Sequence, residues 1–122
     1  MKMKLFFLEE GTKTTIIFRH FKSGLRTSNY RKMLASSAIL LTKNKFQVFA
    51  NFTKIVDVIV KKEMLSKLKI SNPKDKLFVV DFKIEDFDET KSGEISIKMK
   101  IDKVVELLDK IEALTKNFNT SF

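Results

Sequence analysis

Two runs in the C-terminal half alternate apolar and polar residues, and this pattern constrains the fold most. Every second position is apolar in Phe78, Val80, Phe82 and Ile84, and again in Ile95, Ile97, Met99 and Ile101. Successive side chains of a strand point to opposite faces, so each run predicts a strand with one buried and one polar face. The polar link at 86–93 predicts that the two strands form an antiparallel hairpin.

The first half of the chain predicts two more hairpins. Residues 2–8 and 12–21 are rich in aromatic and β-branched types, with Glu10-Gly11 between them as a short turn. Residues 37–42 and 45–51 have the same character and meet at Lys43-Asn44. The segment 22–29 (KSGLRTSN) has loop composition, and Ser28 or Asn29 could cap a short helical turn reaching residue 34.

Two segments predict longer helices. Residues 53–69 place apolar side chains at steps of three and four, although the β-branched run at 55–60 also favours a strand. Asn72-Pro73 breaks the chain after it, because proline disfavours helical geometry in the preceding residue. Asp102 can cap a final helix with one apolar stripe, made of Leu107, Leu108, Ile111, Leu114 and Phe118.

The order of these elements predicts an α+β fold. We expect a mainly antiparallel sheet of hairpins with two helices packed on one face, in a single basic domain spanning 1–122. The strands at 78–84 and 95–101 should pack against Leu108, Ile111 and Leu114. The other face of the sheet is then open to solvent or to a ligand.

Positive charge is concentrated in the first half of the chain. The protein carries 24 Lys and Arg against 15 Asp and Glu, and the 46 residues from 11 to 56 contain nine cations and no acid. A solvated face normally mixes both signs, so this acid-free block predicts a surface that binds an anion. A lysine-rich composition alone does not explain the missing acids.

Cations alternate with aromatic rings inside this block. Single-stranded nucleic acids are bound in this way, because bases stack on aromatic faces while Lys and Arg neutralise phosphates. The sequence therefore predicts a small non-enzymatic protein that binds single-stranded DNA or RNA in preference to duplex. The residues expected to bind are Arg19, Phe21, Lys22, Arg26, Tyr30, Arg31 and Lys32, with Lys43 and Lys45 extending the track; Lys13 should share this surface. For any single aromatic residue, a place in the core is the commoner interpretation.

Two alternatives stay open. The basic half could dock on an acidic protein partner, as in a viral or plasmid accessory protein. Asp81-Phe82-Lys83 with Asp57 upstream is similar to the D…(D/E)xK arrangement of small metal-dependent nucleases, which would use these carboxylates to hold magnesium. The spelling Asp86 to Thr90 (DFDET) matches the DxDxT of aspartyl-phosphate phosphatases, but a solvated hairpin turn explains it better.

Other chemistries find no support in the sequence. The chain has one histidine, three glycines and no cysteine, so paired imidazoles, glycine-rich phosphate loops and thiolate metal sites are not expected. We expect no cofactor and no metal. No apolar run approaches the roughly 20 residues that cross a bilayer, and the start of the chain does not have the apolar length of a signal peptide, so we expect a soluble cytoplasmic protein without a membrane partner. An oligomer is possible.

Overall fold

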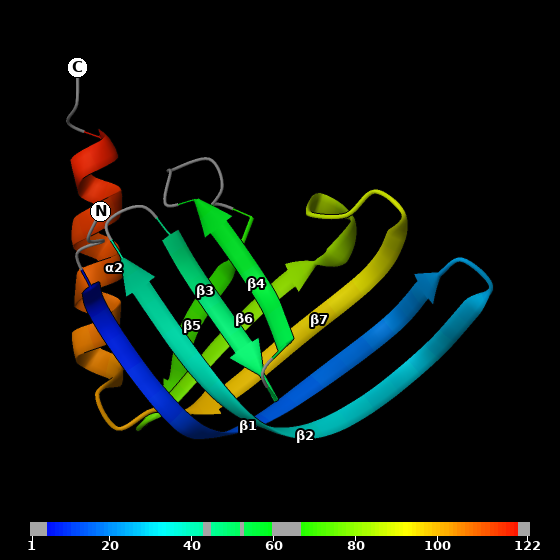
Figure 1. The fold of residues 1–122 in the computed structure, drawn as a ribbon, viewed down its shortest axis with the longest axis horizontal. Helices are drawn as coiled ribbons and strands as arrows, with labels where there is room; N and C mark the ends of the chain where they lie inside the picture. The colour runs from blue at the N-terminus through cyan, green and yellow to red at the C-terminus, as the bar shows by residue number, and fades with distance from the viewer. Residues whose placement is uncertain (1–4, 43–44, 52, 60–66, 120–122) are drawn as a thin grey trace.

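The computed structural model describes residues 5–42, 45–51, 53–59 and 67–119. They form one antiparallel sheet with the strand order β4-β3-β2-β1-β7-β6-β5 (Figure 1). In chain order the elements are β1 (Leu5–Ser23), β2 (Arg26–Thr42), β3 (Lys45–Ala50), β4 (Thr53–Ile59), β5 (Lys69–Lys74), β6 (Leu77–Lys83), the 3₁₀ turn η1 (Ile84–Asp86), β7 (Lys91–Lys100) and α2 (Val104–Asn119). Among the described residues, no helix has the length and apolar character needed to cross a membrane.

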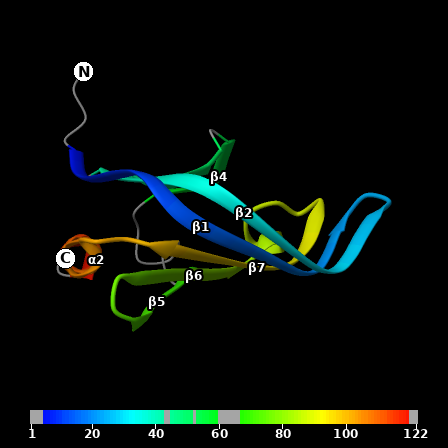
Figure 2. The ribbon, with the colours of Figure 1, turned by 90° about the horizontal axis from the view of Figure 1, so that it is seen from below.

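The expected α+β fold with two helices is wrong. The sheet curls into a half-barrel, and the described residues contain one α-helix, α2 (Figures 1 and 2). Residues 53–59, expected to begin a helix, form β4, with Val56 and Val58 buried and Asp57 exposed between them. β-Branched side chains pack well on a pleated surface, and these residues pair with β3, so they form a strand rather than a helix. The stretch 60–66 of the expected helix lies outside the described residues.

The expected first hairpin is also wrong. β1 is one strand of 19 residues, and Glu10-Gly11 lies inside it, where the pairing with β2 shifts register between Glu9 and Thr12. Two-residue hairpin turns need a residue that accepts positive φ at the first central position, and glutamate rarely adopts that conformation. The actual turn is Gly24-Leu25, with Gly24 at φ 60°, so the expected loop at 22–29 and the short helix after it are parts of β1 and β2.

Three expected elements are confirmed. β2 and β3 pair as a hairpin, as do β6 and β7, where Phe82 lies opposite Ile95. The final helix begins at Val104, shortly after Asp102. Asn72-Pro73 lies inside β5 rather than ending an element; β5 is an edge strand whose pairing with β6 is irregular between Ser71 and Lys74, a place where proline is tolerated.

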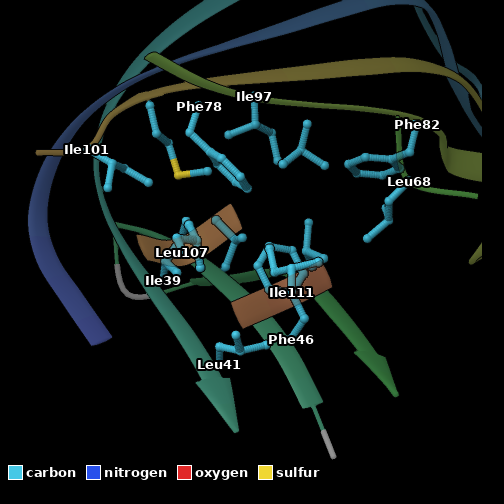
Figure 3. Close-up of a cluster of buried hydrophobic side chains, with 14 of the residues drawn as sticks. Ile39, Leu41, Phe46, Leu68, Phe78, Phe82, Ile97, Ile101, Leu107 and Ile111 are labelled. Carbon is cyan, nitrogen blue, oxygen red and sulfur yellow. The ribbon is translucent and has the colours of Figure 1, made fainter. Parts of the chain in front are cut away.

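The core lies on the concave face of the sheet. Leu107 and Ile111 of α2 lie among side chains from both halves of the sheet, including Ile39, Phe46 and Phe78 (Figure 3). The expected inward residues of β6 and β7 are all buried, and Ile84 is half-buried. Because α2 fills the concave side at one end (Figure 2), the convex face remains uncovered by it. We call the convex face of β2, β1 and β7 the outer face.

Candidate functional site

Strand alternation divides the β1–β2 hairpin into two faces. Thr12, Thr14 and Ile16 of β1 are buried toward the core, so Lys13, Thr15 and the residues that alternate with them lie on the outer face. Residues directly opposite each other in a sheet share a face. The pairing therefore also places residues of β2 and β7 on the outer face. The pairs with β2 are Lys13↔Ser36, Thr15↔Leu34, Ile17↔Lys32 and Arg19↔Tyr30, and the pair with β7 is Thr15↔Lys98.

Four lysines on the outer face are exposed and have no acidic residue opposite them in the pairing. Lys32 lies opposite Ile17, Lys98 lies between Thr15 and Val79, and Lys13 lies opposite Ser36. Lys100 follows Lys98 on the same face of β7 and pairs with Leu77. Within the described part of the chain none of the four takes part in a salt bridge. We call Lys13, Lys32, Lys98 and Lys100 the lysine face.

Arg19 lies on the same face but its charge is partly compensated. Its guanidinium donates a hydrogen bond to Ser96 Oγ at 3.3 Å, and the Ser96 hydroxyl donates to the carboxylate of Asp81. Glu94 lies directly opposite Arg19 and is exposed. A shallow depression of about 630 Å³ at this end of the face combines cations with acids, and its charged lining is Arg19, Lys67, Lys69, Lys83, Asp81, Asp86 and Glu94. This end therefore attracts an anion less than the lysine face does.

Tyr30 supplies an accessible aromatic ring on the outer face, two residues from Lys32 on the same strand. It is 58% exposed and lies opposite Arg19, and Leu34 on the same strand and face is 77% exposed. Phe21, the other expected stacking residue, packs edge-to-face against Phe18 with 5.6 Å between ring centroids. The Phe21 ring is half-buried and already packs against another ring of the protein, so Tyr30 offers the better surface for stacking a base.

The remaining residues expected from the sequence are dispersed. Arg31 lies opposite Phe18, so it faces the concave side. Lys22 and Arg26 are exposed beside the turn at Gly24-Leu25. Lys45 is exposed at the start of β3, next to the far end of β2 and about 33 Å along that strand from Lys32. Lys43 lies outside the described residues.

The structure thus places Lys13, Arg19, Tyr30 and Lys32 on one face, and it adds two lysines that the sequence did not predict for this surface. Lys98 and Lys100 join the face because β7 pairs with β1, a contact between segments about 80 positions apart in the chain. The alternation of Ile97, Met99 and Ile101 already marks these two lysines as outward-facing. Nothing in the sequence marks β1 as their neighbour.

The proposed nuclease carboxylates do not come together. Asp57 on β4 and Asp81 on β6 are five strand steps apart in the sheet, about 24 Å along its surface, whereas two ligands of one magnesium ion each lie about 2.1 Å from it. Asp57 instead pairs with Lys54 at 2.9 Å and accepts a hydrogen bond from Gln47, and the Lys54 contact lowers the pKa of this carboxyl. In the described residues no cluster of three acidic or histidine side chains could hold a metal ion.

The DFDET segment is a solvated turn, as expected. The Asp88 carboxylate accepts hydrogen bonds from the Thr90 hydroxyl at 2.6 Å and the Thr90 N–H at 3.0 Å. These two bonds lower the pKa of Asp88, with a smaller effect from Lys91 at 3.7 Å. A carboxylate engaged with its own turn is accounted for by local structure.

The concave side contains a cavity of about 370 Å³ beyond the part of the core covered by α2. Its aromatic lining is Phe18, Phe21, Phe82 and Phe87, and its charged lining side chains are Lys54, Asp57, Asp88 and Lys91. These four pair with one another, Lys54 with Asp57 and Lys91 with Asp88. An apolar cavity whose described charged groups are already paired offers little to orient a polar ligand.

Comparisons with known proteins add no family to this description. No protein-family model matches the chain, and no curated protein matches it at a significant level. The outer face is therefore the feature of the molecule that bears most on function.

Proposed function

We propose that this protein binds single-stranded nucleic acid on its outer face. The observation that carries the proposal is the lysine face, four exposed lysines without opposing acids, on the same outer face as the exposed ring of Tyr30. Lysines neutralise phosphates while an aromatic ring stacks on a base, which is the combination that single-strand binding uses. The proposal keeps the cytoplasmic location expected from the sequence.

The width of the hairpin favours a single strand over a duplex. The major groove is about 12 Å wide and admits a two-stranded ribbon. Here β7 pairs with β1 as far as Ser23↔Lys91, so nearly the whole length of the hairpin beyond the core is at least three strands wide. Three strands span about 10 Å between their outer backbones, against about 5 Å for two strands, so with side chains added this sheet is wider than the two-stranded ribbon that the groove admits.

Two adjacent cations on opposite faces of β2 provide the sharpest test. Lys32 lies on the outer face and Arg31 on the concave side, so Lys32→Ala should weaken oligonucleotide binding and Arg31→Ala should not. If each lysine neutralises one phosphate, log Kd should change with log salt at about 0.7 per lysine, or about 2.8 for four. Lys32→Ala should lower that slope by about 0.7.

A triple variant enlarges the effect and controls for net charge. Lys13→Ala, Lys32→Ala and Lys98→Ala together should lower the slope by about 2. The matched control replaces three exposed lysines elsewhere, namely Lys54, Lys76 and Lys103, and loses the same formal charge. Fluorescence anisotropy with single- and double-stranded DNA and RNA over a salt series measures both.

Two results would overturn the proposal. Equal slopes for the two triple variants would mean that overall charge, rather than this face, attracts the oligonucleotide. A wild-type protein that binds no oligonucleotide at low salt would favour the alternative of an acidic protein partner.

A further inference from the structure

The outer edge of β2 lacks a partner strand over its distal half. β3 pairs with β2 only from Ser37 to Leu41. Asn51 then ends the ladder: its N–H donates to the Ser36 carbonyl at 2.8 Å, and its side-chain Oδ1 accepts the Ser36 N–H at 3.1 Å. Among the described residues no strand pairs with this edge between Arg26 and Ala35, and Figure 1 shows that part of β2 extending beyond β3 and β4.

The direction of the free backbone groups follows from Ser36. Its N–H and C=O point away from β1, toward Asn51. In an antiparallel strand alternate residues point these groups the same way, and the pairing of β2 with β1 continues without a register shift from Ser37 to Arg26. The backbone groups of Leu34, Lys32, Tyr30 and Ser28 therefore point outward from the edge. The Ser28 hydroxyl reaches the Tyr30 carbonyl at 3.3 Å, which fits this direction.

Large apolar side chains cluster on the same segment. Leu34 and Tyr30 are 77% and 58% exposed, and Leu25 at the turn is fully exposed. An unpaired strand edge that also exposes apolar side chains is a template for another strand. The charges on this edge, Arg26, Arg31 and Lys32, restrict which strand and which register can pair with it.

We propose that the edge of β2 pairs with β2 of a second copy of this chain, antiparallel, with Tyr30 opposite Tyr30. Outward-facing residues must meet outward-facing residues, so the possible registers differ by steps of two. With Tyr30 at the centre, Lys32 lies opposite Ser28 of the second copy and Arg31 opposite Asn29. Leu34 then packs along the hydrocarbon stem of Arg26, and Leu25 lies opposite Ala35.

The neighbouring registers place like charges directly opposite each other. A shift one way puts Arg31 against Arg31 of the second copy, and a shift the other way puts Arg26 against Lys32. Like charges in these positions destabilise a sheet, whereas aromatic pairs stabilise it. The charged residues therefore favour the register centred on Tyr30 over these two neighbouring registers.

The dimer would extend the proposed nucleic-acid-binding surface, and this role rests on the proposed function. The pairing joins the two outer faces into one surface, with both Tyr30 rings at the centre and the lysine face of each copy on either side. A single strand long enough to cross the centre could contact lysines of both copies.

Sedimentation equilibrium of the free protein tests the pairing without nucleic acid. The weight-average mass should rise with concentration from one chain toward two. Ser28→Pro removes an outward N–H and should keep the mass at one chain, whereas Ser28→Ala should associate like the wild type. Thermal unfolding checks that both variants fold. A wild-type mass that stays at one chain over the whole concentration range would overturn the proposal.

A cysteine variant tests the register independently. The chain has no cysteine, so mild oxidation of Tyr30→Cys should give a disulfide-linked dimer. The Cα atoms of a hydrogen-bonded antiparallel pair are about 5.5 Å apart, within the range of disulfides. Leu34→Cys, on the same strand and face, should cross-link far less; more cross-linking at Leu34 than at Tyr30 would refute this register. Because both assays omit oligonucleotide, failed dimerisation and failed nucleic-acid binding are distinguishable.

Discussion

Truncating Leu107 of α2 to alanine should destabilise the protein strongly. Leu107 has no exposed surface and lies in the core cluster on the concave face. The substitution removes three hydrocarbon groups beyond Cβ, which at about 0.8 kcal/mol each represent about 2.4 kcal/mol of lost burial. A cavity that does not collapse adds to this, so the free energy of unfolding should fall by about 2.4 to 5 kcal/mol.

Val105→Ala provides the matched control on the same helix. Val105 is 64% exposed, so its truncation should change the free energy of unfolding by less than about 0.5 kcal/mol. Urea denaturation followed by far-UV circular dichroism measures both variants, and a common dependence on urea concentration shows that the same structure unfolds.

A cost for Leu107→Ala as small as that for Val105→Ala would contradict this prediction. The helix would then not be docked on the concave face of the sheet. The functional proposal would lose its structural premise, because the outer face is identified as the free face from the way α2 and the core fill the other one.

Three further outcomes are expected. Tyr30→Ala should weaken oligonucleotide binding by about 1 to 3 kcal/mol in anisotropy titrations without changing the salt slope, because stacking releases no counterions. Gly93→Ala should destabilise the protein more than Gly24→Ala in urea denaturation, because a Cβ at Gly93 (φ 125°) would lie 2.8 Å from the Phe21 backbone, whereas one at Gly24 meets nothing within 4 Å; the left-handed conformation alone costs Gly24→Ala about 1 to 2 kcal/mol. Thr90→Val should raise the pKa of the Asp88 carboxyl toward its ordinary value in an NMR titration. Since that pKa is lowered in the folded protein, the stability that Asp88 contributes is present above its ordinary pKa and is lost as the pH falls through the lowered one.

Residue patterns within a short stretch of sequence correctly predict the strands and the helix whose structure depends mainly on that stretch. The alternation at 78–84 and 95–101 identified β6 and β7, and an apolar stripe after Asp102 identified α2. The helix predicted for residues 53–59 is wrong because the local sequence fits both structures: Ile55, Val58 and Ile59 have a helical spacing, whereas Val56 and Val58 alternate as in a strand. Pairing with β3, which no short window contains, decided between the two.

The candidate site was only partly predictable for a related reason. Arg31 and Lys32 are adjacent cations in the sequence, yet strand alternation places them on opposite faces. The loop and helical turn predicted for 28–34 do not have the alternation of a strand, so this prediction cannot separate the two cations. Lys98 joins the site only through the pairing of β7 with β1, which depends on how the whole sheet is ordered.

The positions of the acids, more than the number of bases, determine where the outer face carries uncompensated positive charge. The acid-free block supplies β1 and β2, but β7 and β6 come from the half of the chain where acids match bases. Their acids Glu94 and Asp81 lie at the Arg19 end of the face, whereas Lys98 and Lys100 lie at the other end beside Lys13. On the outer face, the cations without nearby acids therefore lie toward the centre of the sheet, and the proposed function predicts that a single strand lies across β7, β1 and β2 with Tyr30 at one margin.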